Sequence, residues 1–171
     1  MHRRVLLAAG LAALAAACTR KPSEPGKPSP EALKNQAAGE AFLQKNAMEP
    51  GVKTTASGLQ YKVVREGPAG GVHPRPQDEV KVHYEGTLLD GTVFDSSYRS
   101  GQPVIFRLGR LIPGWIEGIQ LMKPGDEFIL YVPSKLAYGD QDGGPIPPGS
   151  TLVFRIELLG VLQSNGGVGL G

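Results

Sequence analysis

Cysteine is nearly absent from this chain of 171 residues: Cys18 is the one example, so the chain can form neither an internal disulfide nor a thiolate metal cluster. Histidine is also scarce, and His73 and His83 do not have the spacing of a metal site. No phosphate loop, cofactor fingerprint, paired catalytic carboxylates or nucleophile–base motif is visible. We therefore predict a protein without metal or cofactor.

An excess of one charge is missing as well. Lys and Arg number 18 against 16 Asp and Glu, and two of the basic residues, Arg3 and Arg4, lie in a segment that we expect to be removed. The remaining 16 basic and 16 acidic residues balance, and no basic stripe remains. This composition argues against nucleic-acid binding.

A long hydrophobic run is lacking too, because the apolar run from Val5 to Ala17 has 13 residues and a membrane span needs about 20. A positive start, this run and small residues before Cys18 instead predict a signal peptide over residues 1–17. A signal ending at a lone cysteine resembles that of bacterial lipoproteins, which implies a lipidated Cys18. Ala15 stands where such signals more often have leucine, so an ordinary secretory signal with a free thiol is the alternative. Thr19 after the cysteine favours the outer membrane, facing the periplasm.

Residues 18–30 hold four prolines and predict an extended tether. Helix formers with apolar residues at three- and four-residue spacing then predict a helix from Pro30 to Asn46, ended by Glu49–Gly51, within a helix-and-linker segment over residues 31–53. A helix of about 16 residues is marginal alone, so we expect it to pack on the next domain or a partner.

The remainder alternates in the manner of β-strands and is rich in Gly and Pro, with one helical interruption at Pro113–Met122. Expected strands cover Leu59–Val64, Val80–Leu89, Pro103–Leu108, Glu127–Val132 and Leu152–Leu159. We predict an α+β fold in which a bent antiparallel sheet wraps around one short helix. The glycine-rich tail, residues 163–171, is expected to be disordered.

The most informative segment runs from Val82 to Ser97. It alternates like a strand, turns at Asp90–Gly91 and returns to Phe94–Asp95. An acid at the end of an apolar run is costly to bury unless it is paired or hydrogen-bonded, which indicates a site. With five further blocks, this segment resembles the FKBP-type peptidyl-prolyl cis-trans isomerases from about Thr54 to Leu162. The blocks are Val104–Gly109, Ile112–Trp115, Ala137–Gly139, Ile146–Gly149 and Thr151–Phe154.

The helix at Pro30–Asn46 and the segment Gly51–Tyr61 are similar to the macrophage-infectivity-potentiator-like branch of that family. Those relatives often dimerise through a long N-terminal helical region. This chain lacks that length, so we predict a monomer.

The resemblance implies ten pocket residues in two groups. The catalytic group is Tyr84, Phe94, Asp95, Trp115 and Tyr138. The substrate-binding group is Val104 (where several relatives have an aromatic residue), Leu111, Ile112, Ile146 through its backbone N–H, and Phe154. Plain alternatives are that Trp115 is core, that Asp95 is a solvated turn carboxylate and that Tyr138 anchors a loop.

The predicted function is isomerisation of X-Pro bonds in exported polypeptides, without a covalent step. An apolar pocket would favour the twisted amide, and macrolides of the FK506 or rapamycin type would block it. The alternatives are a holdase chaperone that binds unfolded or proline-containing chains with little turnover, and a purely structural lipoprotein.

Overall fold

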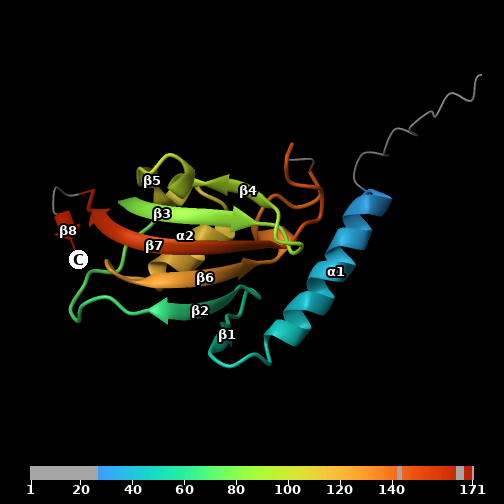
Figure 1. Cartoon of the computed structure of the whole chain (residues 1–171), viewed down its shortest axis with the longest axis horizontal. Helices are drawn as coiled ribbons and strands as arrows, with labels where there is room; N and C mark the ends of the chain where they lie inside the picture. Colours follow the sequence, from blue (N-terminus) through green and yellow to red (C-terminus); the bar gives the residue numbers. More distant parts are fainter. Residues whose placement is uncertain (1–26, 142–143, 165–167, 171) are drawn as a thin grey trace, which may run out of the picture.

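The computed structural model describes residues 27–141, 144–164 and 168–170 (Figure 1). The predicted signal peptide at residues 1–17, Cys18 and the tether up to residue 26 lie outside the described residues. The elements in chain order are α1 (Pro30–Asn46), β1 (Val52–Thr54), β2 (Gln60–Arg65), β3 (Glu79–Thr87), β4 (Val93–Ser96), β5 (Val104–Arg107), α2 (Pro113–Gln120), β6 (Glu127–Val132), β7 (Leu152–Leu162) and β8 (Val168–Leu170), with three short 3-10 turns, η1 (Ser97–Arg99), η2 (Leu108–Arg110) and η3 (Ser134–Leu136).

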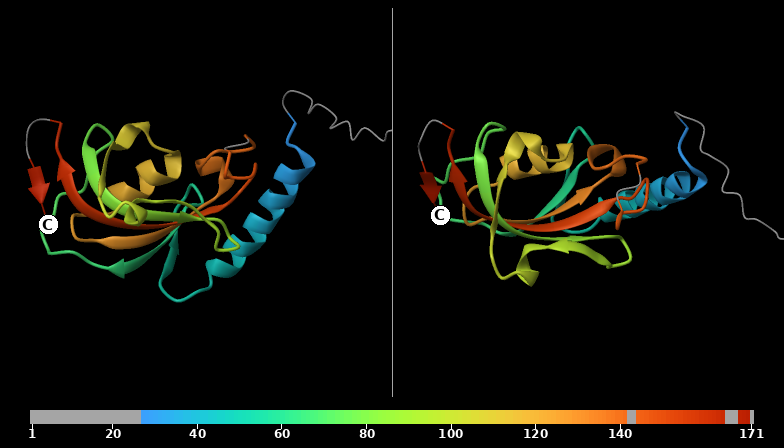
Figure 2. Two further views of the ribbon diagram at one scale, coloured as in Figure 1. Left: turned by 45° about the horizontal axis from the view of Figure 1, so that its top comes forward. Right: turned by 90° about the horizontal axis from the view of Figure 1, so that it is seen from above.

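The eight described strands form one antiparallel sheet in the order β1-β2-β6-β7-β3-β4, with β5 also pairing β3 and β8 pairing β7. Figure 2 shows this sheet curving around α2, while α1 lies across one end of it. The predicted α+β architecture, a bent sheet around one short helix, is confirmed. No helix in the described part of the chain is long and apolar enough to cross a bilayer.

Glycines on α2 let the helix approach the sheet closely. An added Cβ at Gly114 would collide with Val132, and one at Gly118 would lie 2.5 Å from Leu130. Both partners are inward-facing residues of β6 and fully buried. With its glycines against β6, α2 buries the neighbouring Trp115 and Ile119 in the core. The position of Trp115 therefore depends on two residues that have no side chain.

The tail departs from the sequence-based expectation. Val168–Leu170, within the segment expected to be disordered, forms β8 and pairs with Gly160–Leu162 of β7. Strand β7 has 11 residues and pairs with β6 only from Leu152 to Glu157. At its C-terminal end, residues 160–162, the backbone groups on this side of β7 have no partner in β6. A segment of low strand propensity can therefore pair with them.

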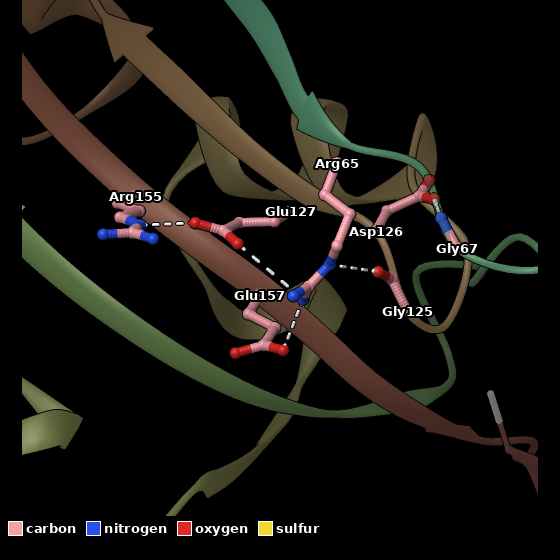
Figure 3. A network of polar contacts seen from close by, with 7 residues as sticks. All are labelled: Arg65, Gly67, Gly125, Asp126, Glu127, Arg155 and Glu157. Carbon is pink, nitrogen blue, oxygen red and sulfur yellow. Dashed lines mark hydrogen bonds and ion pairs between the residues drawn. The ribbon is translucent and has the colours of Figure 1, made fainter.

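An ionic network covers the sheet face opposite α2 (Figure 3). Glu127 of β6 is buried between Arg155 of β7 and Arg65 of β2, and Arg65 also pairs with Glu157. Both guanidinium groups are about half exposed, so solvent screens the pairs and each contributes little to stability.

Asp126, beside this network, is 3% exposed and accepts hydrogen bonds through both of its carboxylate oxygens. It receives the backbone N–H of Gly67 at 2.6 Å, the backbone N–H of Lys123 at 2.9 Å and the Lys123 ammonium at 2.9 Å. Burial by itself would raise the pKa of this carboxyl, but the two N–H donors and the ammonium outweigh burial and lower the pKa. The folded state therefore holds Asp126 ionised.

We expect Asp126→Asn to lower the free energy of unfolding at pH 7 by about 1–3 kcal/mol, because buried N–H donors lose a charged acceptor. Since the folded-state pKa lies below the unfolded one, the carboxylate stabilises the fold above about pH 4 and loses this effect as the pH falls through the folded value. Urea unfolding between pH 7 and pH 2 should show a smaller acid-induced loss of stability in the variant. Equal acid slopes for both proteins would contradict this role.

Candidate active site

A pocket of about 200 Å³ lies between α2 and the curved sheet. Its lining comes from β3, β4, β5, α2 with the residues just before it, the loop after η3, and β7. The nine lining residues are Tyr84, Phe94, Asp95, Phe106, Leu111, Ile112, Trp115, Tyr138 and Phe154.

Trp115 is held at the pocket by aromatic rings on three sides. Its ring centre lies 5.2 Å from that of Tyr84, 5.2 Å from that of Phe154 and 5.9 Å from that of Phe106, all in edge-to-face geometry. Such aromatic pairs add to the stabilisation from burial alone. The indole N–H is buried without a hydrogen-bond partner among the described residues. Packing alone therefore fixes the ring.

Asp95 and Tyr84 form the polar contact of the pocket. The Tyr84 hydroxyl donates to Asp95 Oδ2 at 2.6 Å. Burial raises the pKa of Tyr84 strongly, and the bond to Asp95 and its negative charge raise it further, so the phenol stays neutral. Asp95 itself is exposed. The structure thus shows Asp95 ordering Tyr84 through a direct hydrogen bond.

Gly86 leaves room for the pocket walls. It is an inward-facing residue of β3, and a Cβ at this position would lie 2.6 Å from Phe94 Cζ and 2.9 Å from Phe154 Cε1. The two rings themselves meet edge to face with centres 5.7 Å apart. The missing side chain therefore lets both phenylalanines close over the strand.

Eight of the ten residues predicted from the sequence line this pocket, and Val104 and Ile146 do not. Val104 is half-buried against the core, and the side chain of Ile146 is a core residue with 6% exposure. Phe106 takes the place expected for Val104. The two lie on one face of β5 because strand residues alternate, so the signal that could have found Phe106 was its spacing of two from Val104.

The pocket is not the largest hollow. A groove of about 620 Å³ lies between α1 and the segments around β2 and η3, and none of the predicted site residues line it. Its walls combine apolar residues such as Leu43 and Pro133 with polar ones such as Gln36. In the described residues, no group of three or more His, Cys, Asp and Glu side chains could hold a metal ion.

Fold and pocket define a class of protein: α+β domains whose curved sheet and short helix enclose a small aromatic pocket. A family model described as FKBP-type peptidyl-prolyl cis-trans isomerase matches residues 70–159. The chain belongs to this family. A second model, described as the domain amino terminal to FKBP-type peptidyl-prolyl isomerase, matches residues 10–63.

Individual relatives agree. An FKBP-type peptidyl-prolyl cis-trans isomerase FkpA of Aeromonas hydrophila is 51% identical over 79% of this chain and 50% of its own length. Outer membrane protein MIP of Legionella longbeachae is 47% identical over 78% of this chain and 57% of its own. The crystal structure of a peptidyl-prolyl cis-trans isomerase from Pseudomonas syringae is 37% identical, with a TM-score of 0.71, over 81% of this chain and all of that one. The chain spans about half the length of the curated relatives that it matches.

Proposed function

We propose that this chain catalyses the cis–trans isomerisation of X-Pro bonds in polypeptides. The observation that carries the proposal is the pocket in which Trp115, Phe154 and the hydrogen-bonded Tyr84–Asp95 pair converge. A purely structural role would leave unexplained why these side chains line a cavity. The proposal is also supported by the family to which the chain belongs.

The chemistry needs no nucleophile. Rotation about a peptide bond meets a barrier of about 18–20 kcal/mol, because twisting breaks the amide conjugation. The planar amide is the more polar form, so a pocket that excludes water favours the twisted one. A thousandfold acceleration corresponds to only about 4 kcal/mol. Desolvation together with one or two oriented hydrogen bonds supplies free energy of this size.

The proposed roles follow from position. Trp115 forms the floor beneath the pyrrolidine ring, and Phe94, Ile112 and Phe154 form walls, with Leu111 at the rim. The Tyr138 hydroxyl, on a side chain that is 46% exposed, holds a substrate carbonyl oxygen. The backbone N–H of Ile146 holds a second one, and Asp95 acts through Tyr84.

We expect the wild-type chain to accelerate isomerisation of an X-Pro peptide, and Tyr138→Phe to lower kcat/KM about tenfold, because one hydrogen bond to the substrate is lost. Asp95→Ala should give a similar loss by freeing the Tyr84 hydroxyl. A protease-coupled peptide assay measures all three, with Tyr98→Phe, an exposed tyrosine outside the pocket, as the matched control. FK506 or rapamycin should block the wild-type rate. A wild-type rate equal to the uncatalysed one would contradict the proposal, and the holdase interpretation would then remain.

We propose further that the chain works in the bacterial cell envelope on exported polypeptides. Support comes from the predicted signal peptide and from a relative named outer membrane protein MIP. The finer proposals are a lipid anchor on Cys18, an outer-membrane location facing the periplasm, and a monomeric state. The short N-terminal helix supports the last of these.

A further inference from the structure

The loop between η3 and β7 carries Tyr138, and its two stems lie side by side. The backbone N–H of Gly149 donates to the carbonyl of Gly139 at 2.9 Å, one residue from Tyr138. The N–H of Gly139 in turn donates to the carbonyl of Ser134 at 2.9 Å. The position of the Tyr138 hydroxyl over the pocket therefore depends on how both stems are held.

The first half of α1 lies directly against these stems. Asn35 Nδ2 donates to the carbonyl oxygen of Pro148 at 2.9 Å, and Gln36 Nε2 donates to Asp140 Oδ1. Each bond reaches a different stem. Figure 1 shows the N-terminal end of α1 and this loop next to each other at the same end of the sheet.

At two further contacts, a glycine lets α1 lie close to the loop and the start of β7. A Cβ on Gly149 would collide with the carbonyl of Ala32, and a Cβ on Gly39 would collide with the Thr151 side chain. Positions 32, 35, 36 and 39 follow the i, i+3, i+4, i+7 spacing, so they form one face of the helix. This contact face consists of small and polar residues, whereas the apolar Leu33 is 54% exposed.

The other end of α1 is fastened independently. Asn46 Nδ2 donates to Gln60 Oε1 at 2.8 Å, and Gln60 Nε2 donates to the carbonyl of Leu43 at 2.8 Å. The Phe42 ring lies 5.9 Å from that of Tyr131 on β6. The helix is thus anchored on the sheet at one end and on the loop stems at the other.

We propose that α1 braces the two stems of this loop, residues 137–140 and 147–151, and that Asn35 and Gln36 are positioning residues which set the place of the Tyr138 hydroxyl. The helix then belongs to the substrate-binding machinery although it touches no substrate. This inference rests on the proposed function only for the contact between Tyr138 and the substrate. The brace itself is a property of the loop and can be measured without turnover.

The first arm of the test is amide hydrogen exchange on the full-length chain. In Asn35→Ala/Gln36→Ala, protection of the Gly139 and Gly149 amides should fall about tenfold, because the stems lose both side-chain bonds while the other end of α1 keeps its anchor. Gln44→Ala, at an exposed position of the same helix outside the face that meets the stems, is the matched control and should leave both amides unchanged. Unchanged exchange in the double variant would overturn the brace, whether or not the wild type is active.

The second arm is kinetic. The double variant should lower kcat/KM roughly three- to tenfold, mainly by raising KM. In a Tyr138→Phe background the same two substitutions should cost less than about twofold, because the hydroxyl that they position is gone. A full additional loss in that background would mean that α1 does not act through Tyr138 and would overturn the proposal. An inactive wild type with altered loop exchange would instead refute the isomerase function and leave the brace standing.

Discussion

Trp115→Ala is expected to remove most of the isomerase activity and to lower the free energy of unfolding by about 3–5 kcal/mol. Trp115 is 4% exposed and contacts three aromatic rings, so truncation leaves a large void at the pocket floor. The stability loss comes from that void. The activity loss has a separate cause, because the pyrrolidine ring no longer has an apolar surface on which to sit.

Two variants separate these effects. Ile119→Ala truncates a fully buried residue one turn further along α2 that does not line the pocket, so it should cost about 2–5 kcal/mol and leave kcat/KM nearly unchanged. Trp115→Phe keeps an apolar floor and should retain part of the activity. Trp115 is the chain's one tryptophan, so its substitution removes the tryptophan fluorescence signal. Unfolding of these variants is therefore measured by circular dichroism. If Trp115→Ala loses stability but keeps kcat/KM, the indole only packs in the core and does not contribute to catalysis.

Gly86→Val is the second substitution with a large expected effect, and we expect it to lower kcat/KM at least tenfold. Its branched side chain would occupy the space of the Phe94 and Phe154 ring edges, whose atoms already lie 2.6 Å and 2.9 Å from a Cβ. The rings must move into the pocket or away from each other, and either shift changes the walls. Because valine suits a strand, we expect a moderate cost in stability of about 1–3 kcal/mol.

Lys81→Val is the matched control for Gly86→Val. It places the same side chain on β3, on the exposed face of the strand, and should change neither activity nor substrate affinity. Peptide binding can be followed by Trp115 fluorescence, and unfolding by circular dichroism. Wild-type affinity in Gly86→Val would show that the positions of the two rings do not determine the pocket.

Local patterns were sufficient to predict most of the sheet. The alternation at Val80, Val82 and Tyr84 predicts which side of β3 faces the core, because strand side chains point to opposite faces in turn. Proline at the start and glycine after the end located α2, and Pro30 located the start of α1. These signals depend on neighbours within a few residues. They could therefore be interpreted without knowing the fold.

Other features depend on residues far apart in the chain. Phe106 of β5 packs against Trp115 of α2 and lines the pocket, whereas Val104 does not line it. The tail adds to β7 as β8 because β7 extends beyond β6. The tail has no signal for this pairing within its own segment, and the alternation in β5 shows only that Val104 and Phe106 face the same way.

The sequence by itself determined the family, the alternating strands, the two helices and eight of the nine residues that line the pocket, because those patterns are local or belong to motifs of known spacing. Tertiary structure alone decided that Phe106 packs on Trp115 and that α1 meets the loop stems through Asn35 and Gln36. Hydrogen-bond partners and contact faces are set by which distant backbone segment comes close, and helical periodicity cannot identify that segment.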